Sequence, residues 1–281
     1  MKLEMKNVRF SFEKKDKKEQ PLFDNLNVKI ESGEFVGIVG ETGAGKSTLM
    51  QLLGGIIEPD SGEVLCDDEN IYSSSYDLVK YNCRVGKVFQ YPEHQLFANS
   101  VMEDVCFGPI NQGLSKEEAV EKAKKALIDV GVDEDNFSKS PFELSGGQKR
   151  RVAIAGVLAM EPEFLFLDEP TAGLDPAGRD EILDLISAMR KERKIAVVII
   201  SHSMEDMAKY VDRLIVMKSS NIVLDGDAKE ILTRNDELEA AGLVSPQIYY
   251  IMKQLKEAGL PINEEIINVE DARKELLRVL S

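Results

Sequence analysis

Residues 35–53 read FVGIVGETGAGKSTLMQLL, and this stretch decides the fold. It opens with a short continuous apolar run, which is typical of a strand buried on both faces of a sheet. Residues 40–47 then match the pattern G-x-x-x-x-G-K-[ST], and an apolar pattern with helical spacing begins at Leu49. A buried strand before this pattern and a helix after it are the context that predicts a phosphate-binding loop.

The predicted loop has the chemistry that a triphosphate needs. Its glycines let the backbone aim N–H groups at phosphate oxygens, and a helix beginning near Lys46 adds its positive end. Lys46 is predicted to bring a charge to the β- and γ-phosphates, and Ser47 to supply a hydroxyl ligand for Mg²⁺. Glu41 is acidic, but the second position of such loops usually points its side chain away from the phosphates. The loop residues predicted to bind ATP are Gly40, Glu41, Thr42, Gly43, Ala44, Gly45, Lys46, Ser47 and Thr48.

Two further predicted site residues follow another apolar run. Residues 164–169 read FLFLDE, so two carboxylates stand at the C-terminal end of a predicted buried strand. Open α/β sheets bind their ligands at that edge. We expect Asp168 to hold Mg²⁺, directly or through water, and Glu169 to polarise the attacking water as a general base.

The composition is that of an acidic globular protein. The chain has 281 residues and a net charge of −15, and its 43% hydrophobic residues are enough for a substantial core. Because this charge repels nucleic acid and anionic lipid, we expect no nucleic-acid partner. The densest basic run, KKDKK at residues 14–18, lies between two strand-like segments and is expected to be a solvated turn.

Neither a targeting segment nor a membrane span is predicted. The first six residues contain no apolar stretch of the signal-peptide type, and the strongest apolar runs fall far short of the roughly 20 residues that a membrane helix needs. Cys66, Cys83 and Cys106 share no metal-ligand or redox spacing, so we expect free thiols in a reducing cytosol. If the protein acts at a membrane, we therefore expect it to do so through a partner protein.

The alternation of strand and helix patterns predicts an α/β fold with a mostly parallel sheet. Strand patterns recur at residues 8–12, 26–30, 35–39, 85–89, 164–167 and 196–200. Residues 58–90 indicate only short strands and turns, and residues 91–160 look like a helical insertion. Residues 231–281 look like a small helical appendage, with Pro246 at a first helical position and Asn268 at the start of the last helix.

Residues 144–150 read LSGGQKR, which predicts a second anion cradle. Ser145 can cap the following helix, and the two glycines expose N–H groups at the positive end of that helix. The segment resembles the signature sequence of ATP-binding-cassette (ABC) proteins. In that family two subunits associate head to tail, and the signature of one closes on the γ-phosphate held by the other. The residues implied to contact the ATP of the partner are Leu144, Ser145, Gly146, Gly147 and Gln148.

The resemblance covers about residues 1–230 and implies roles for four more residues. Gln90 resembles the glutamine that contacts Mg²⁺ and water, and His202 the switch histidine that contacts γ-phosphate and joins Lys46 and Glu169 in catalysis. Asp175 resembles the carboxylate that couples the two sites of the dimer, and Phe12 the aromatic that stacks on adenine. The implied cofactors are ATP and Mg²⁺, and the implied activity is ATP hydrolysis coupled to transport.

The implied fold is a RecA-like phosphate-loop core with an N-terminal antiparallel β subdomain, an inserted helical subdomain and a small C-terminal helical extension. The corresponding boundaries are residues 1–90 and 161–230 for the core, 91–160 for the helical signature subdomain and 231–281 for the extension.

Residues 91–97 read YPEHQLF and are similar to the same stretch in energy-coupling-factor importers of vitamins and of cobalt or nickel. Residues 105–109 and the helical tail also fit that group, and the Pro-Glu-His-Gln form looks most like the second of its two paralogous ATPases. This resemblance implies a second ATPase, itself or a paralogue, and an integral membrane coupling protein with a substrate-binding membrane subunit. The segment after Gln90 would receive a helix of the membrane protein, which makes His94 a partner contact rather than a metal ligand. The implied location is the cytoplasmic face of the cell membrane, as a peripheral protein.

Other functions stay open at this point. An exporter ATPase is the main alternative, because the motifs do not encode the direction of transport. ABC ATPases of DNA repair usually insert a coiled coil or zinc module that this sequence lacks, and translation factors of the family carry two cassettes. A regulatory subunit without activity would have a degenerate site, whereas Lys46, Asp168, Glu169, Ser145 and His202 are all present.

Overall fold

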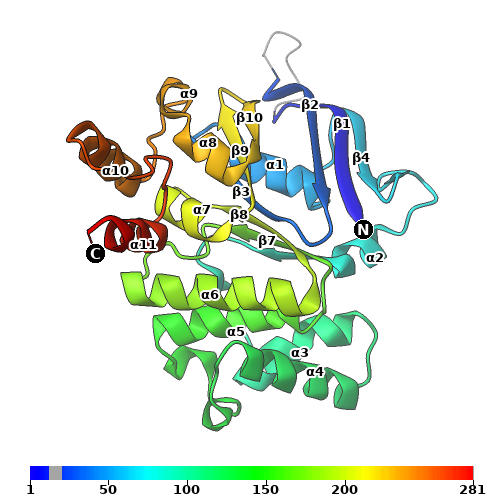
Figure 1. Ribbon diagram of the computed structural model, residues 1–281. Coiled ribbons are helices and arrows are strands. Elements are labelled where there is room, and N and C mark those ends of the chain that lie inside the picture. The colour runs from blue at the N-terminus through cyan, green and yellow to red at the C-terminus, as the bar shows by residue number, and fades with distance from the viewer. Residues whose placement is uncertain (13–20, 281) are drawn as a thin grey trace.

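Two sheets with surrounding helices make up the computed structural model, which describes residues 1–12 and 21–280 (Figure 1). The strands are β1 Lys2–Phe10, β2 Phe23–Glu31, β3 Phe35–Gly40, β4 Ser61–Cys66, β5 Glu69–Asn70, β6 Val85–Val88, β7 Phe164–Asp168, β8 Ala196–Ile200, β9 Arg213–Lys218 and β10 Asn221–Asp227. The basic run at residues 14–18 lies outside the described residues, so the turn predicted there stays a prediction.

The helices follow the strands along most of the chain. The α-helices are α1 Lys46–Leu53, α2 Leu78–Arg84, α3 Val101–Asn111, α4 Lys116–Asp129, α5 Gly146–Leu158, α6 Pro176–Arg193, α7 Met204–Tyr210, α8 Ala228–Thr233, α9 Asn235–Ala240, α10 Gln247–Glu257 and α11 Val269–Leu280. Short 3-10 helices are η1 Pro92–Gln95, η2 Glu134–Asn136 and η3 Pro141–Glu143. None of the helices within the described range is long and apolar enough to cross a membrane.

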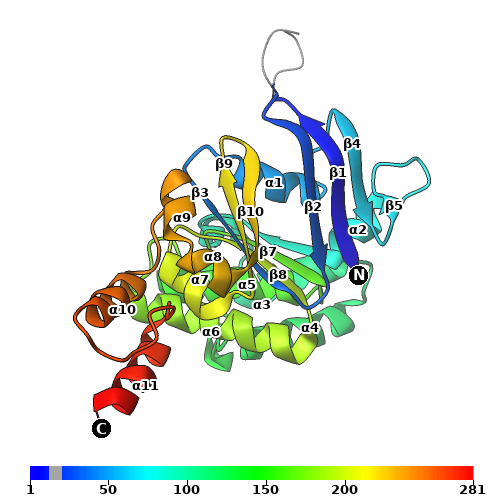
Figure 2. The same cartoon turned by 45° about the horizontal axis from the view of Figure 1, so that its top comes forward.

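The central sheet has the strand order β10-β9-β3-β8-β7-β6. Pairing is parallel from β9 through β6, and β10 adds an antiparallel edge. Every residue of β3 and β8 is buried, which explains their continuous apolar sequences. Side chains of β7 alternate between two cores: Phe164 and Phe166 face one cluster, and Leu165 and Leu167 face the other. Helix α1 covers one face of this sheet, and α5 and α6 lie on the other (Figures 1 and 2).

A smaller antiparallel sheet, with the order β2-β1-β4-β5, packs on the α1 side of the central sheet (Figure 2). Leu3, Met5 and Val28 from its strands share one apolar cluster with Leu49 of α1. Helices α3, α4 and α5 pack together in the other cluster, beyond α6 in Figure 1. The predicted α/β class, the N-terminal antiparallel sheet and the helical insertion are therefore confirmed.

Two local expectations were wrong. Residues 58–90 contain helix α2, which begins after Asp77, whose side chain accepts a hydrogen bond from the Lys80 N–H at 3.0 Å. This helix has seven residues and buries only Tyr81, so no helical period is visible in its sequence. Pro246 is the N-cap of α10 instead of its first helical residue. The last helix does begin directly after Asn268, whose side chain accepts from the Asp271 N–H at 2.9 Å.

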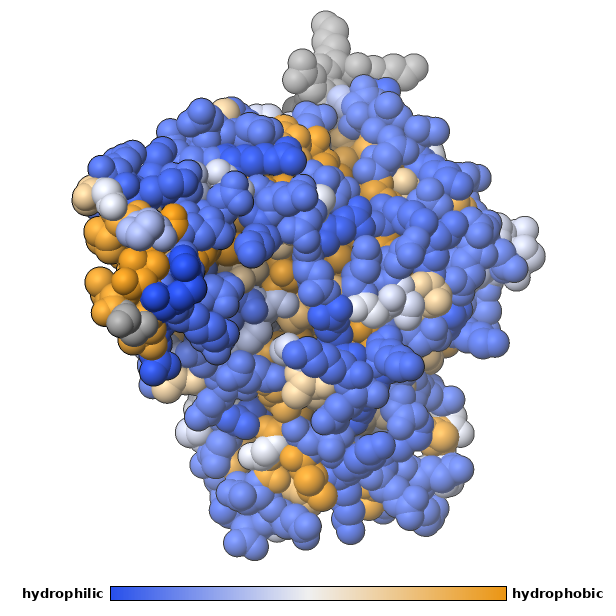
Figure 3. Space-filling model, viewed as in Figure 1, coloured by the Kyte–Doolittle hydropathy of each residue, from blue (hydrophilic) through white to orange (hydrophobic). Residues whose placement is uncertain are grey.

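Helices α10 and α11 form a small unit with its own apolar cluster. Met252, Ile262, Ile266 and Ala272 are its buried members. Further apolar side chains of this unit remain exposed, and Figure 3 shows them gathered on the left of the molecule. They include Ile251, Val269, Leu277 and Leu280.

Candidate active site

A cavity of about 350 Å³ lies where β3, β7 and β8 end and α1 begins. It brings together the phosphate loop, both predicted carboxylates, the predicted glutamine and the predicted histidine. The residues that line it are Thr42, Gly43, Gly45, Lys46, Ser47, Thr48, Gln90, Asp168, Glu169, Ile200 and His202. The topology explains this convergence, because the carboxyl ends of parallel strands meet at one edge of a sheet.

The phosphate loop folds around its own lysine. The ammonium of Lys46 donates to the carbonyl oxygens of Gly40 at 2.7 Å and Glu41 at 3.0 Å. Burial lowers the pKa of Lys46, and the charges of Glu169 and Asp168 oppose this shift. Helix α1 begins after Gly45, with no side chain capping its first N–H groups. Those N–H groups therefore remain available to an anion at the positive end of the helix.

The carboxylate of Glu169 faces His202. Its Oε1 lies 3.1 Å from His202 Nε2, and the Glu169 N–H donates to the Ile200 carbonyl at 3.0 Å. The Glu169 backbone has φ 50°, an uncommon value for a residue with a side chain. Burial raises the pKa of Glu169; His202 opposes the shift, Asp168 adds to it and Lys46 opposes it. A half-buried carboxylate with a raised pKa beside a histidine is suited to proton transfer.

Oxygen atoms that suit a hard cation stand beside the phosphate loop. Burial raises the pKa of Asp168, and a hydrogen bond from the Ser47 side chain opposes that shift. Gln90, two residues beyond β6, lines the same cavity. No group of three or more His, Cys, Asp or Glu side chains is arranged for a metal ion within the part of the chain that the structure describes. This donor set fits a cation that takes one carboxylate and draws its other oxygens from phosphates and water.

The family model described as ABC transporter matches residues 23–172. The chain belongs to the ABC transporter family. A protein of Clostridium acetobutylicum named energy-coupling factor transporter ATP-binding protein EcfA2 is 48% identical over 100% of this chain and 98% of its own length. The protein of the same name from Acetivibrio thermocellus is 48% identical over 93% of this chain and 92% of its own length. Within the family, the chain therefore belongs to the ATP-binding proteins of energy-coupling factor transporters, and its activity is ATP hydrolysis.

Solved structures agree with this assignment. The cbiO1 protein of Clostridium perfringens, described as part of the ABC transporter complex cbiONQ, has a TM-score of 0.75 and 38% identity, covering 89% of this chain and 98% of that one. The ATP-binding cassette MJ0796, solved as a dimer in a post-hydrolysis state with ADP and Pi, has a TM-score of 0.70 and 29% identity. That match covers 80% of this chain and 98% of the cassette. The fold of this ABC ATPase is thus the predicted one.

The signature of this ATPase lies outside the cavity. Ser145 caps α5 by accepting from the Gln148 N–H at 3.3 Å, and the Gln148 side chain accepts from the Ser145 N–H at 3.0 Å. Leu144 is buried, whereas no atom lies within 4 Å of the position that a Cβ would take at Gly146 or Gly147. The glycines of the signature thus face open space.

Other predicted residues also stand apart from the cavity lining. Phe12 is 69% exposed and packs edge-on against Phe10, with ring centroids 5.1 Å apart. Asp175 caps α6 by accepting from the Gly178 N–H at 2.7 Å. Ala44 is buried, and the exposed Glu41 points its carboxylate at Gly242, between α9 and α10. The acidic side chain is thus directed away from the phosphate loop, as expected for its motif position.

Sequence reasoning gave no role to Arg150, although the residue stands within the signature segment. It is buried, and it pairs with Glu93 in the segment that follows Gln90. A signal was present, because Arg150, Ile154 and Leu158 recur every four residues on one buried face of α5. A charged residue in such a row needs a buried partner.

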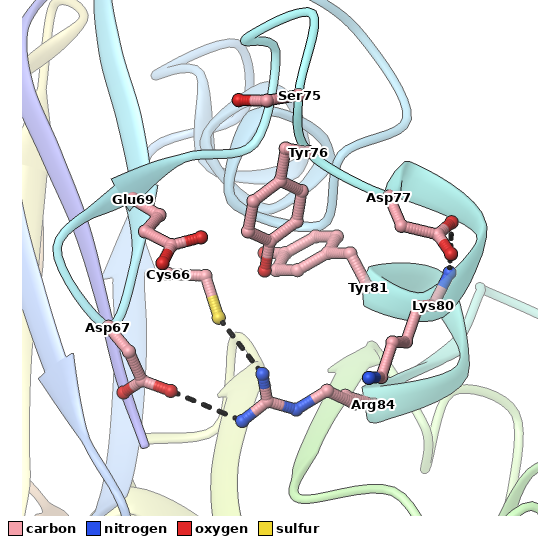
Figure 4. Close-up of a pocket in the computed structure, with 9 residues that line it drawn as sticks. All are labelled: Cys66, Asp67, Glu69, Ser75, Tyr76, Asp77, Lys80, Tyr81 and Arg84. Carbon is pink, nitrogen blue, oxygen red and sulfur yellow. Dashed lines mark hydrogen bonds and ion pairs between the residues drawn. The ribbon is translucent and has the colours of Figure 1, made fainter.

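A second cavity, of about 300 Å³, lies between β4, β5 and α2 (Figure 4). Arg84 points into it, and each nitrogen of its guanidinium already has a partner among Glu163, Asp67 and Cys66. Burial raises the pKa of the Cys66 thiol, which keeps it protonated and unreactive. Cys66, Cys83 and Cys106 are all free, as predicted. The guanidinium of Arg84 is thus satisfied inside the chain, and Lys80 is the other basic residue in the lining.

Proposed function

We propose that this chain hydrolyses Mg-ATP in the cavity between α1 and the ends of β3, β7 and β8, and that this drives uptake through an energy-coupling factor importer. The observation that carries the proposal is the convergence of Lys46, Asp168, Glu169, Gln90 and His202 on one cavity. Five polar groups from four distant segments would have no reason to meet there without a shared ligand.

In this proposal Glu169 is the general base. A water molecule attacks the γ-phosphorus of ATP, its proton passes to Glu169, and the bond to the β-phosphate oxygen breaks to leave ADP and phosphate. Lys46 and His202 stabilise the charge on the γ-phosphate oxygens, and His202 also orients the Glu169 carboxylate 3.1 Å away. The raised pKa of Glu169 makes it a stronger base than an exposed carboxylate.

The remaining site residues bind and orient the nucleotide. N–H groups from Gly43 to Thr48 would cradle the phosphates, and the exposed ring of Phe12 would stack on adenine. Ser47, Gln90 and Asp168 would hold Mg²⁺, which would neutralise negative charge on the phosphates.

The partner of the signature is a second ATPase, either a copy of this chain or a paralogue. Gly146 and Gly147 stand at an open helix start, which supports a head-to-tail dimer in which this segment and Asp175 complete the neighbour's site. The similar cassette MJ0796 has been solved as a dimer, which supports the proposal that two ATPase subunits associate.

Coupling to a membrane protein is proposed for a groove of about 450 Å³ beside the segment after Gln90. Its lining is mainly apolar and includes Phe97 and Phe107, whose rings are 5.0 Å apart and which are both exposed. A helix of an integral membrane coupling protein would occupy it, and a substrate-binding membrane subunit would set the cargo, a vitamin or a cobalt or nickel ion. This places the chain peripherally on the cytoplasmic face of the cell membrane.

A division of the chain follows from these roles. Residues 1–90 and 161–230 would form the nucleotide-binding core, 91–160 the signature subdomain and 231–281 the C-terminal extension. The separate apolar cluster of α10 and α11 supports the last boundary.

The variant Glu169→Gln tests the proposal. It keeps the size of the side chain but removes the base, so the purified complex should bind ATP, hydrolyse it at least a hundredfold more slowly, and accumulate closed dimers seen by size-exclusion chromatography. Turnover at the wild-type rate would remove Glu169 from the mechanism.

Purification of the tagged chain from native membranes tests the partners. We expect a second ATPase with a small integral membrane protein, and recovery without any membrane protein would refute the transport role.

A further inference from the structure

Arg150 is a buried cation that joins three segments far apart in sequence. Its Nε and Nη2 donate to the two carboxylate oxygens of Glu93 at 3.0 and 2.7 Å, and its Nη1 donates to the Ala172 carbonyl at 2.7 Å. The side chains of Arg150 and Glu93 are 3% and 16% exposed. We call these three residues the Glu93–Arg150–Ala172 clamp.

The clamp fixes the orientation of its side chains more than it stabilises the fold. Removing two charges from water costs about as much as their attraction returns, so a buried pair of this kind stabilises a fold little. A guanidinium that grips both oxygens of a carboxylate does fix the orientation of both groups. Burial alone would raise the pKa of Glu93, but hydrogen bonds from Arg150 and from its own backbone lower it, so Glu93 stays ionised.

One end of the clamp holds the turn that carries the proposed base. The Ala172 N–H donates to the Glu169 carbonyl at 3.1 Å, and the Ala172 carbonyl accepts from Arg150. Glu169 itself has φ 50°. A residue with a side chain is strained in that region and keeps its conformation only where its surroundings impose it. Arg150 is thus one of the contacts that impose the backbone geometry of Glu169.

The other end of the clamp lies in the segment that borders the groove. Glu93 belongs to η1. The groove is lined by Gln95, Leu96 and Phe97, which lie two to four residues after Glu93 in the chain. Arg150 lies one turn before Ala153, which lines the same groove from α5. A movement of η1 or α5 at the groove would therefore displace the clamp.

A second contact runs in parallel with the clamp. The Tyr91 ring lies 3.9 Å from the position that a Cβ would take at Gly173, in the turn after Glu169. Tyr91 also stacks on His94, with ring centroids 5.8 Å apart. The segment after Gln90 therefore approaches the turn directly at Gly173 and is joined to Ala172 through Arg150.

We propose that Glu93 and Arg150 are positioning residues, which hold the turn of Glu169 in its hydrolytic geometry and couple that geometry to the occupant of the groove. The inference rests on the proposed function, since it assigns the clamp to the same base and the same groove. Neither residue lines the proposed ATP cavity, so loss of the clamp should slow turnover and leave nucleotide affinity unchanged. A misplaced base costs roughly tenfold to a hundredfold in rate.

The test uses the complete transporter reconstituted in lipid vesicles, with Mg-ATP as the only added ligand. Glu93→Gln keeps shape and removes the charge, and Arg150→Lys keeps the charge and removes the fork. Each should lower kcat roughly tenfold to a hundredfold and leave KM for ATP within about twofold. The double variant should lose no more than the single ones, because the two residues act as one unit. Arg151→Lys is the matched control. Arg151 lies on the same helix as Arg150, but it contacts Val130 and Glu181 and not the turn after Glu169.

Thermal unfolding of each variant, with and without Mg-ATP, separates misfolding from mispositioning. A raised KM with unchanged kcat, an equal loss in Arg151→Lys, or additive losses in the double variant would overturn the proposal. Wild-type turnover in a folded Glu93→Gln would overturn it as well. Loss of turnover in Glu169→Gln together with wild-type kcat in both clamp variants would refute the clamp alone. Wild-type turnover in Glu169→Gln would refute the proposed function.

Discussion

Helices α1 and α5 of this ATPase both begin with glycine-rich segments, and their surroundings differ. At the start of α1, a Cβ added to Gly45 would lie 2.8 Å from the ring of Phe23, and Lys46 is only 7% exposed. At the start of α5, an added Cβ would meet no atom within 4 Å at either Gly146 or Gly147. The first helix start is enclosed by its own chain, and the second is open.

The capping of the two helices differs in the same sense. No side chain caps α1, so its first N–H groups are left for a ligand, whereas Ser145 and Gln148 cap α5 within the chain. Glycine inside a helix costs about 1 kcal/mol relative to alanine. Contacts within the chain explain the glycine before α1, because a side chain there would meet Phe23. No contact within the described chain explains the glycines of α5. In the proposed dimer, the requirement for glycine at the open start would come from the partner subunit.

The substitution Gly147→Asp separates the two helix starts most sharply. A carboxylate at the beginning of α5 is favourable for the isolated helix, by about 0.3–1 kcal/mol. In the dimer it would face the phosphates bound by the neighbour. We expect an unchanged or higher unfolding temperature, unchanged ATP binding by the isolated chain, and hydrolysis reduced at least a hundredfold. Nearly normal hydrolysis would mean that the signature contacts no phosphate.

At the enclosed start, Lys46→Met should instead weaken ATP binding by the isolated chain. Hydrogen bonds to charged groups contribute about 1.5–3 kcal/mol each, so losing the contacts to two phosphates predicts a loss of affinity on the order of a hundredfold. Isothermal titration with Mg-ATP measures this without any partner. Wild-type affinity would argue against the assignment of the phosphate loop. Lys149→Met, in α5 and outside the cavity lining, is the matched control.

Both helix starts could be predicted from the sequence because their signals are local. The strand, loop and helix around Lys46 are contiguous, and Ser145 with Gln148 is a capping box spaced three residues apart. Asp168 was expected at the site by the rule that ligands bind at the carboxyl ends of parallel strands, whereas His202 was implied by the resemblance to ABC proteins, and both line the same cavity.

What could not be predicted depends on contacts between distant segments. Glu93 and Arg150 are 57 positions apart, and nothing local pairs them. Helix α2 buries only Tyr81, which is too little for a periodic pattern. The direction of the Glu41 side chain against Gly242 depends on how the C-terminal extension returns to the phosphate loop.

The paired substitutions Gly45→Ala and Gly146→Ala turn the comparison into a stability measurement. Gly45 has φ 95°, and an added methyl group would press on Phe23, so Gly45→Ala should lower the free energy of unfolding by about 1–3 kcal/mol. Gly146→Ala meets no atom and should leave it unchanged or raise it by up to about 1 kcal/mol. Urea denaturation of the nucleotide-free chain measures both. Equal destabilisation by the two variants would refute the distinction between an enclosed and an open start.

A partly buried lysine, Lys87 of β6, lies against the C-terminal end of α1, and the smallest expected effect is the pH dependence that it gives to the free energy of unfolding. The stem of Lys87 lies against Gly54, the C-cap of α1, and burial lowers the pKa of Lys87 to about 8. A cation is favourable at a helix C-terminus, so the lowered pKa means that the cost of burial exceeds this gain.

Between the folded pKa of Lys87 and its unfolded value the unfolded chain binds one more proton, so this lysine adds stability as the pH rises through that window. Relative to Lys87→Met, the wild type should gain roughly 2 kcal/mol in the free energy of unfolding between pH 7 and pH 10. Subtracting the two urea series removes the contribution of the titrating groups that both proteins share. A flat difference would mean that Lys87 is solvated, and that α1 is enclosed at its phosphate end alone.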